Sequence, residues 1–546
     1  MVKKFFILIV FVFTGNFLLA QPVKKIDKPK LVVGIVVDQM RWDYLYRYYD
    51  RYGDGGFKRL LNDGFSCENT LINYLPSYTA VGHSVIFTGS IPAIDGIVGN
   101  DWIDQITDKS WYCTEDSSVQ TVGATGKAGQ MSPRNLLVST ITDELRLATN
   151  FRSRVVGVSL KDRASILPAG HTANGAFWFD DASARFITST YYMQDLPDWV
   201  KHFNDSNNPQ KLVAGGWNTL YPINTYTQST ADNVTWEGKF EGEKEPVFPH
   251  DMKNIYQDDH GSIRSTPFGN TLTIDFAKAA VDGYNLGNGK ATDFLTINCA
   301  STDYVGHQYG PNSIEVEDTY LRLDKDLASF FQFLDQKVGK ENYLVFLTAD
   351  HGAAHAIGFM QDHHVPADYL VSKKMTTDLD EYLNQQFGVS NLISSYINYH
   401  FSFDLKKIAD NKLDYDLVKK AAVSFLQKQP GIQFAVDIDD IGDAPIPEPL
   451  KTDIINGYNS KRCGPIMILS DPGWFGGHEG GTGTTHGNWN PYDTHIPLVF
   501  MGWGIKHGVS NRTIKMSDIS PTLAAILRIQ MPNGNVGKVI SEIIND

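Results

Sequence analysis

Cysteine is scarce in this sequence. The chain has 4 cysteines among 546 residues, and none of them forms a C-x-x-C pair, so the pattern argues against a cysteine-based zinc site. Cys299 lies inside an apolar run, where we expect a buried thiol. In an exported protein a disulfide between Cys67 and Cys113 could form. The sequence does not decide whether any of the four is paired: Cys67, Cys113, Cys299 and Cys463.

Positive charge is also in short supply. Lysine and arginine number 48 against 62 aspartate and glutamate residues, for a formal net charge of −14. A nucleic-acid-binding protein presents a basic face, so we expect no nucleic-acid partner. The same balance means that an anionic substrate has to be attracted by a local cluster of positive charge.

Long apolar runs are absent after the first twenty residues. Phe5–Phe13 follows two lysines and is itself followed by small residues ending at Ala20, which is typical of a secretory signal peptide over residues 1–20. An N-terminal membrane anchor is the alternative, but the run is shorter than the roughly 20 residues that a membrane span needs. No cysteine follows as a lipid acceptor. We predict a periplasmic or secreted protein whose mature chain has no membrane span.

No repeat of fixed period occurs, which excludes solenoids and propellers. Instead, several short runs rich in β-branched residues each adjoin a polar cluster, and runs that are apolar throughout indicate strands buried on both faces. Apolar residues spaced by three or four from Val316 to Val338 predict a helix with Ser313 as its N-cap. We therefore predict an α/β fold with a mostly parallel central sheet flanked by helices. The predicted strands cover residues 31–37, 154–160, 293–300, 343–349 and 496–500.

Two regions break this alternation. Residues 165–290 are rich in Trp, Tyr, Asn and Gly and show little periodicity, and residues 365–480 have the pattern of a compact accessory unit. We interpret both as insertions that form a cap over one core, so that residues 21–546 make a single domain.

Carboxylates and imidazoles gather where the predicted strands end. In parallel sheets ligands bind beyond the carboxyl ends of the strands, so these side chains are expected to converge. Nitrogen and oxygen ligands of this kind suit zinc, and six of them can hold two ions with positions left open for a substrate. The six predicted metal ligands are Asp38, Asp303, His307, Asp350, His351 and His486.

Thr79 is the predicted nucleophile. It follows Pro76 in a P-x-x-T segment that leads into an apolar helical run. A hydroxyl at the start of a helix lies beside free backbone N–H groups, which attract anions, and a nearby metal ion could lower its pKa. The alternative is that Thr79 only caps the helix.

The ordered set of motifs resembles the alkaline phosphatase superfamily, and within it the PafA type of phosphate-irrepressible, broad-specificity bacterial enzymes. The resemblance runs from about Leu31 to the C-terminus. It rests on Asp38, the P-x-x-T segment, Asp95-Gly96-Ile97-Val98-Gly99-Asn100, D-x-x-x-H from Asp303 to His307, Asp350-His351-Gly352 and Thr485-His486-Gly487.

This resemblance implies an α/β core, two zinc ions per chain and a phosphothreonine intermediate. It further implies that one zinc is held by Asp303, His307 and His486. The other would be held by Asp38, Thr79, Asp350 and His351. The non-bridging phosphate oxygens would be contacted by Asn100, Lys161 and Arg163.

We therefore expect an exported, zinc-dependent alkaline phosphatase that hydrolyses a broad range of small phosphate monoesters, and we expect it to be a monomer. The nearest alternative is a nucleotide pyrophosphatase/phosphodiesterase of the same superfamily, which shares the metal ligands, the threonine and the asparagine. Lys161 and Arg163 favour the monoesterase, because a monoester dianion suits two cations. A non-catalytic binding protein on this fold would lack a ligand or the nucleophile, and none is missing.

Overall fold

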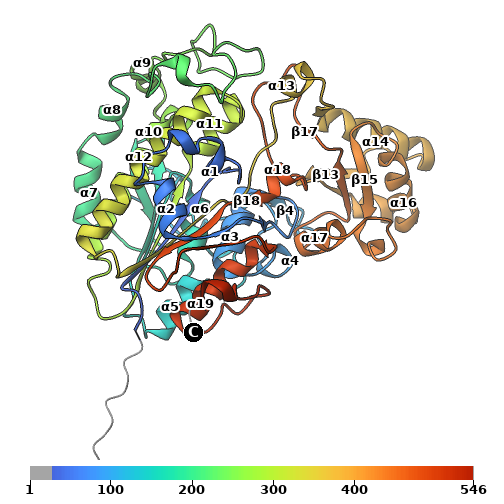
Figure 1. The fold of residues 1–546 in the computed structure, drawn as a ribbon. Helices are drawn as coiled ribbons and strands as arrows, with labels where there is room; N and C mark the ends of the chain where they lie inside the picture. Colours follow the sequence, from blue (N-terminus) through green and yellow to red (C-terminus); the bar gives the residue numbers. More distant parts are fainter. Residues whose placement is uncertain (1–26, 545–546) are drawn as a thin grey trace, which may run out of the picture.

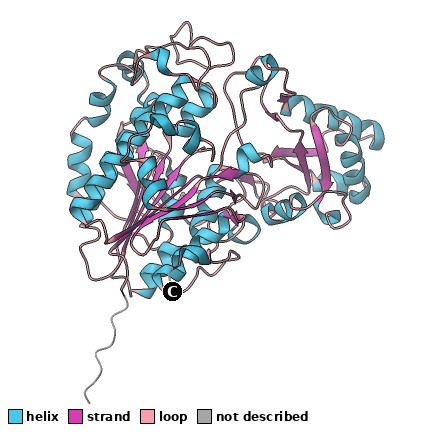
Figure 2. Cartoon of the chain, viewed as in Figure 1, coloured by secondary structure: helices cyan, strands magenta, loops and turns pink. Residues whose placement is uncertain are grey.

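A mixed ten-stranded sheet forms the centre of the molecule (Figures 1 and 2). The structure is a computed structural model and describes residues 27–544, so the predicted signal peptide lies outside the described residues. In sheet order the strands are β20 (Gly508–Ser510), β2 (Phe65–Cys67), β19 (Leu498–Gly502), β11 (Tyr343–Thr348), β1 (Leu31–Val37), β10 (Asp293–Cys299), β7 (Val155–Val158), β8 (Gly175–Asp180), β9 (Arg185–Ser189) and β6 (Thr121–Val122).

The five middle strands, β11, β1, β10, β7 and β8, are parallel, as predicted. All seven residues of β1 are buried, which explains its unbroken apolar run. Strand β19 runs antiparallel to β11. The residues that precede β19 therefore lie at the same edge of the sheet as the residues that follow β1, β10 and β11. Polar residues before one strand and after three others are thus brought to one edge.

Helices cover both faces of this sheet (Figure 1). On one face α10 and α12 pack against each other and α10 contacts β10, while on the other face α3 packs on α6 and α19. The flanking helices are α2 (Phe57–Asp63), α3 (Thr79–Thr88), α5 (Ile141–Ala148), α6 (Asp162–Ala169), α10 (Pro267–Tyr284), α11 (Ser301–Tyr309), α12 (Ile314–Lys337) and α19 (Ile519–Leu527).

The helix predicted from the spacing of apolar residues is α12. Its N-cap is Ser313, whose side chain accepts a hydrogen bond from the backbone N–H of Val316, so the predicted cap is confirmed. The helix buries Tyr320, Leu327 and Leu334 along one stripe. This stripe anchors α12 to the core, and α12 also contacts α11, which carries two of the predicted metal ligands.

The stretch 165–290 contributes to the core as well as to its cover. Strands β8 and β9 extend the central sheet, and α10 lies on its face. Short helices and loops connect them on the outside of the molecule (Figure 1). These helices are α7 (Asp198–Asp205), α8 (Asn208–Val213) and α9 (Met252–Asp258).

The stretch 365–480 forms a lobe at the right of Figure 1 with its own small sheet and apolar core. The lobe sheet has the order β13 (Ile393–Ile397), β14 (His400–Phe403), β16 (Ile466–Ser470) and β15 (Ile432–Asp437). Its helices include α14 (Ser372–Phe387), α16 (Tyr415–Leu426) and α17 (Leu450–Gly457). That the lobe and residues 165–290 act as a cap within one domain stays a prediction.

The remaining strands and helices are short. The strands among them are β3 (Thr70–Leu71), β4 (Asp101–Ile103), β5 (Ser110–Tyr112), β12 (Asp368–Leu370), β17 (Trp474–Gly476), β18 (His495–Ile496) and β21 (Ile514–Lys515). The helices are α1 (Tyr44–Arg47), α4 (Pro92–Asp95), α13 (Ile357–Asp362), α15 (Leu405–Asp410) and α18 (Pro491–Thr494).

The four cysteines are free thiols, and all are buried, Cys299 among them as expected. The pairing of Cys67 with Cys113 that the sequence left open is therefore not formed. Between residues 27 and 544 no helix is both long enough and apolar enough to cross a bilayer.

Candidate active site

The six predicted metal ligands converge at the carboxyl edge of the sheet. Asp38 directly follows β1, Asp350 and His351 follow β11 by two and three residues, and Asp303 lies on α11 just after β10. His486 comes from the loop between β17 and α18. Five of the six are buried, and the sixth, His307, is partly exposed. The convergence follows from parallel topology, because consecutive βα units end at one edge.

Two groups of these side chains are close enough to hold metal ions. One consists of Asp38, Asp350 and His351, and the other of Asp303, His351 and His486, with the ligand atoms of each group within 4.8 Å of one another. His351 belongs to both groups. His307 lies outside both by this distance, but its Nε2 is 3.1 Å from Asp303 Oδ1. The two groups defined by distance thus differ from the two predicted ligand sets: His351 belongs to both groups, and His307 belongs to neither.

All three imidazoles are oriented in the same way. The Nδ1 atom of His307 lies 2.8 Å from the carbonyl of Thr484, and those of His351 and His486 lie 2.9 Å and 2.8 Å from the carbonyls of Gly352 and Ser77. A carbonyl can only accept, so each Nδ1 carries a proton, and Nε2 is the atom of each ring that is left to bind a metal. This is the arrangement of imidazoles that bind metal through Nε2.

The carboxylates also fit a bound cation. Within residues 27–544, the buried oxygens Asp38 Oδ1 and Asp350 Oδ2 have no hydrogen-bond partner. Burial, as the main cause, and the negative charge of Asp350, as the second, raise the pKa of Asp38 well above its usual value. A buried carboxylate oxygen without a hydrogen-bond partner is costly, and a cation between these two oxygens would supply the missing interaction. The donor set of carboxylates and neutral imidazoles suits zinc.

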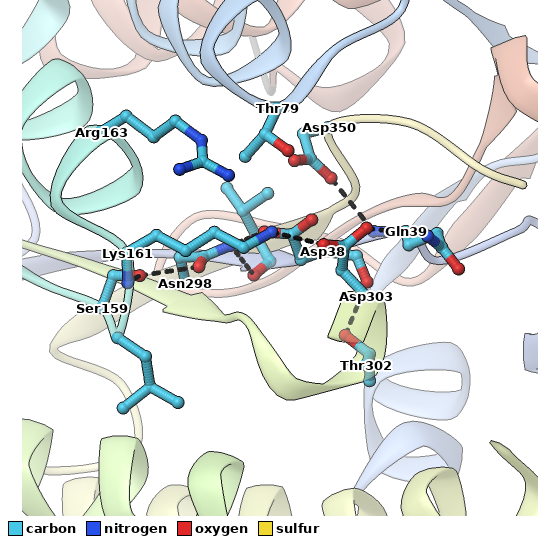
Figure 3. A network of polar contacts seen from close by, with 12 residues as sticks. Asp38, Gln39, Thr79, Ser159, Lys161, Arg163, Asn298, Thr302, Asp303 and Asp350 are labelled. Atoms are coloured by element: carbon cyan, nitrogen blue, oxygen red, sulfur yellow. Dashed lines mark hydrogen bonds and ion pairs between the residues drawn. The ribbon is translucent and has the colours of Figure 1, made fainter. Parts of the chain in front are cut away.

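Lys161 lies between the two groups (Figure 3). Its Nζ is 2.8 Å from Asp38 Oδ2 and 2.6 Å from Asp303 Oδ2, and it is almost fully buried. Burial lowers the pKa of Lys161, but Asp303 and Asp38 outweigh this and raise it above its usual value. The ammonium therefore stays charged, and it connects one carboxylate of each group.

Thr79 is the first residue of α3, and Tyr78 is the N-cap. The alternative in which Thr79 caps the helix is therefore wrong. Thr79 is buried, and its Oγ1 lies 3.3 Å from His351 Nε2. The next backbone N–H, that of Ala80, donates to Asn100 Oδ1 at 3.0 Å. The hydroxyl thus faces the group of Asp38, Asp350 and His351, with Asn100 beside it.

Arg163 enters from the first turn of α6. Its Nη1 donates to the hydroxyl of Tyr112 at 3.1 Å, and that hydroxyl donates to Asp162 Oδ1 at 2.5 Å. The guanidinium points toward Thr79 in Figure 3. Its Nε has no partner within the described residues. The hydrogen bond to Tyr112 therefore orients the guanidinium, which retains N–H donors for a substrate.

Several polar residues around the ligands were not predicted from sequence. Asn298, inside β10, donates to Asp38 Oδ2 at 3.2 Å, and Thr302 donates to the carbonyl of Asp38 at 2.5 Å. Gln39 donates to Asp303. Asn298 could have been noticed as the one amide in an apolar strand; Gln39 and Thr302 carry no comparable signal, because their roles depend on contacts between distant segments.

The comparison with known proteins agrees with this geometry. The family model described as type I phosphodiesterase / nucleotide pyrophosphatase matches residues 32–493. Alkaline phosphatase PafA of Elizabethkingia meningoseptica is 58% identical over 96% of both chains. A crystal structure of wild-type PafA superposes with a TM-score of 0.93 at 57% identity, covering 95% of this chain and 100% of that chain. The chain belongs to the PafA-type alkaline phosphatases.

Other relatives of this PafA-type chain carry different names. Alkaline phosphatase PhoV of Synechococcus elongatus is 54% identical over 95% of this chain and 94% of its own. A Myroides odoratus protein named calcium-transporting ATPase is 55% identical over 95% of this chain and 96% of its own. The α/β fold expected from sequence is confirmed by the PafA structure, and the chain is an alkaline phosphatase.

Proposed function

We propose that this alkaline phosphatase is an exported zinc enzyme that hydrolyses a broad range of small phosphate monoesters through a phosphothreonine intermediate on Thr79. The observation that carries the proposal is the position of Thr79. Its buried hydroxyl lies 3.3 Å from His351 Nε2, beside groups of carboxylates and imidazoles that suit two metal ions.

These ligands would hold two zinc ions, one of them bound by Asp303, His307 and His486. The other would be held by Asp38, Thr79, Asp350 and His351. When bound, the pair would lower the pKa of the attacking hydroxyl or water and neutralise charge on the leaving oxygen. The partial exposure of His307 indicates that the leaving group is on its side of the site, because that side is open to solvent.

The phosphate would be bound by Asn100, Lys161 and Arg163. Arg163 keeps free donors in a rigid planar group that can bind two phosphate oxygens. Lys161 already contacts Asp38 and Asp303. Its positive charge would therefore both attract the phosphate and offset the negative charge of these two carboxylates. Asn100 lies next to the first backbone amide after Thr79.

The reaction would proceed in two displacements. The Thr79 hydroxyl gives up its proton and Oγ forms a bond to phosphorus as the ester P–O bond breaks, while the departing oxygen takes up a proton and leaves as the alcohol. Water then attacks phospho-Thr79, the Thr79 oxygen takes a proton, and inorganic phosphate leaves. Two in-line steps retain the configuration at phosphorus. Arg163 and Lys161 would hold the non-bridging oxygens through both steps.

Phosphodiester hydrolysis is the second candidate, favoured by the description of the matching family model. A diester has one fewer charged oxygen, so it gains less from two cations. The buried Lys161 and the partly buried Arg163 therefore favour monoesters.

The N-terminal pattern of residues 1–20 supports export to the periplasm or the medium. A monomer remains our expectation.

The proposal is tested by measuring kcat/KM on an aryl phosphate and on its methyl diester, with elemental analysis of the same sample. We expect a strong preference for the monoester and two zinc ions per chain. Full activity in a sample without metal would overturn the zinc part of the proposal. A preference for the diester would favour the phosphodiesterase.

A further inference from the structure

Gln39 contacts both groups of predicted metal ligands. Its side-chain Nε2 donates to Asp303 Oδ1 at 2.7 Å, and its backbone N–H donates to Asp350 Oδ1 at 3.2 Å. It directly follows Asp38 and is 3% exposed. Figure 3 shows its side chain beside these carboxylates.

Two hydrogen bonds, one from Lys161 and one from Gln39, orient the carboxylate of Asp303. Its Oδ2 accepts from Lys161, and its Oδ1 accepts from Gln39 while facing His307 Nε2 at 3.1 Å and His486 Nε2 at 3.8 Å. A carboxylate oxygen has two lone pairs, so Oδ1 can accept from the amide and still bind a metal. The amide is uncharged and therefore orients the oxygen without repelling a cation.

The backbone of Gln39 is held in an unfavourable conformation. Its φ is 62°, in the left-handed region, which costs free energy for a residue with a side chain. Such outliers cluster at functional sites. Here the conformation allows the N–H of Gln39 to reach Asp350 while its side chain reaches Asp303.

Gly306 on α11 provides the space for this side chain. A Cβ at Gly306 would lie 1.9 Å from Gln39 Oε1. Glycine weakens a helix interior, yet here it lies between Asp303 and His307, where any side chain would displace the amide. The D-x-x-x-H segment thus contains the glycine that makes room for the residue that orients its aspartate.

We propose that Gln39 is a positioning residue that directs Asp303 toward the zinc ion it shares with His307 and His486 and couples it to Asp350 of the other ion. This inference rests on the proposed two-zinc function. It predicts that the amide group of Gln39 affects metal affinity at one site more than at the other.

The test uses Gln39→Met, which keeps a side chain of similar length but removes the N–H donor. Zinc affinity is measured by competition with a chromogenic chelator, and thermal unfolding of the metal-free protein reports on the fold. We expect one of the two zinc ions to bind about 10- to 100-fold more weakly, with the metal-free protein still unfolding in one cooperative transition and with activity restored by excess zinc. Gln361→Met on α13, an exposed position, is the matched control and should bind zinc as the parent does.

Gly306→Ala gives an independent route to the same effect. Its Cβ would push the Gln39 amide away while leaving that residue in place, so zinc affinity should fall by a similar factor. In a Gln39→Ala background the side chain is already absent, and adding Gly306→Ala should change zinc affinity little. Additive losses would mean that Gly306 acts by another route and would overturn the coupling.

The outcomes separate the two proposals. If the parent protein binds no zinc, the two-zinc function fails. If the parent binds two zinc ions and Gln39→Met binds both with parental affinity, the positioning role of Gln39 is wrong while the function stands. Should Gln39→Met fail to fold, the affinity of Gly306→Ala decides the question.

Discussion

Replacing Arg163 with alanine should separate phosphate recognition from metal binding. Arg163 contacts Tyr112 and the start of its own helix, and within residues 27–544 it makes no hydrogen bond or ion pair with a predicted metal ligand. Lys161, by contrast, touches both Asp38 and Asp303, so its removal would alter the charge around the metal ions as well. Arg163 is therefore the cleaner probe of the monoester assignment.

The size of the effect follows from the contacts that Arg163 would make. A hydrogen bond to a charged group contributes about 1.5–3 kcal/mol, and about 1.4 kcal/mol corresponds to a tenfold change in rate. Loss of Arg163 should therefore lower kcat/KM for an aryl phosphate about 10- to 150-fold. The methyl diester should lose less, because its methylated oxygen carries no charge for the guanidinium to bind.

The assay compares both substrates for the parent and Arg163→Ala, with zinc content measured in each sample. Arg163→Lys keeps the charge and should recover only part of the rate, because an ammonium cannot bind two oxygens in a plane. If Arg163 made only a surface ion pair, its removal would cost ~0–1 kcal/mol, and the monoester rate would barely change. An equal fall on both substrates would refute the reasoning, because it would show that Arg163 does not distinguish the charge of the phosphoryl group.

Three further predictions concern other parts of the molecule. Thr79→Ala should lower monoester hydrolysis by several orders of magnitude and abolish trapping of phosphoprotein; parental rates would exclude Thr79 as the nucleophile. Exhaustive chelation should abolish hydrolysis, and zinc should restore it better than magnesium alone; recovery with magnesium only would contradict the choice of metal. Burial, and after it the nearby charge of Glu315, raises the pKa of Glu237 to about 10. The folded state therefore keeps a proton that the unfolded chain loses near pH 4.3. The free energy of unfolding should fall as the pH rises between these two values. Glu237→Gln should accordingly have a higher Tm than the parent, by a margin that grows from pH 5 to pH 9; a margin that shrinks would show that Glu237 is ionised in the folded protein.

The parallel part of the fold could be predicted because burial on both faces leaves a clear pattern. Leu31–Val37 and Tyr343–Thr348 are apolar throughout, and polar residues begin where these strands end. The antiparallel direction of β19 could not be predicted, because a short apolar run has the same composition in either direction. The direction places Asp493 at the site, where its carboxylate accepts from the N–H of Asn488 in the loop that carries His486.

The six metal ligands were predicted from the chemistry of their side chains at strand ends, and the phosphate contacts only from the resemblance to the family. The residues that support them carry neither signal. An aspartate at a strand end is costly unless bound, so Asp38 and Asp350 stand out in sequence. In the sequence Gln39 and Tyr112 carry no sign of a role. Gln39 gains one from its hydrogen bond to Asp303 on α11, and Tyr112 from its hydrogen bond to Arg163. Contacts between segments that are distant in sequence set these roles, and residue type alone does not encode them.

The elements that would distinguish monoesters from diesters are few and lie on one side of the site. Asp38, Asp350 and Thr79 belong to the sheet edge and α3, and in the proposed mechanism they would serve any phosphoryl transfer that uses two metals and a hydroxyl nucleophile. Lys161 and Arg163 come from the start of α6, and Tyr112 reaches Arg163 from the β4–β5 hairpin. Because α6 packs on α3, the position of the cations relative to the Thr79 hydroxyl is fixed by the packing of two helices. The core could therefore keep its chemistry while a change in the first turn of α6, or in the hairpin behind it, alters which phosphate ester is preferred.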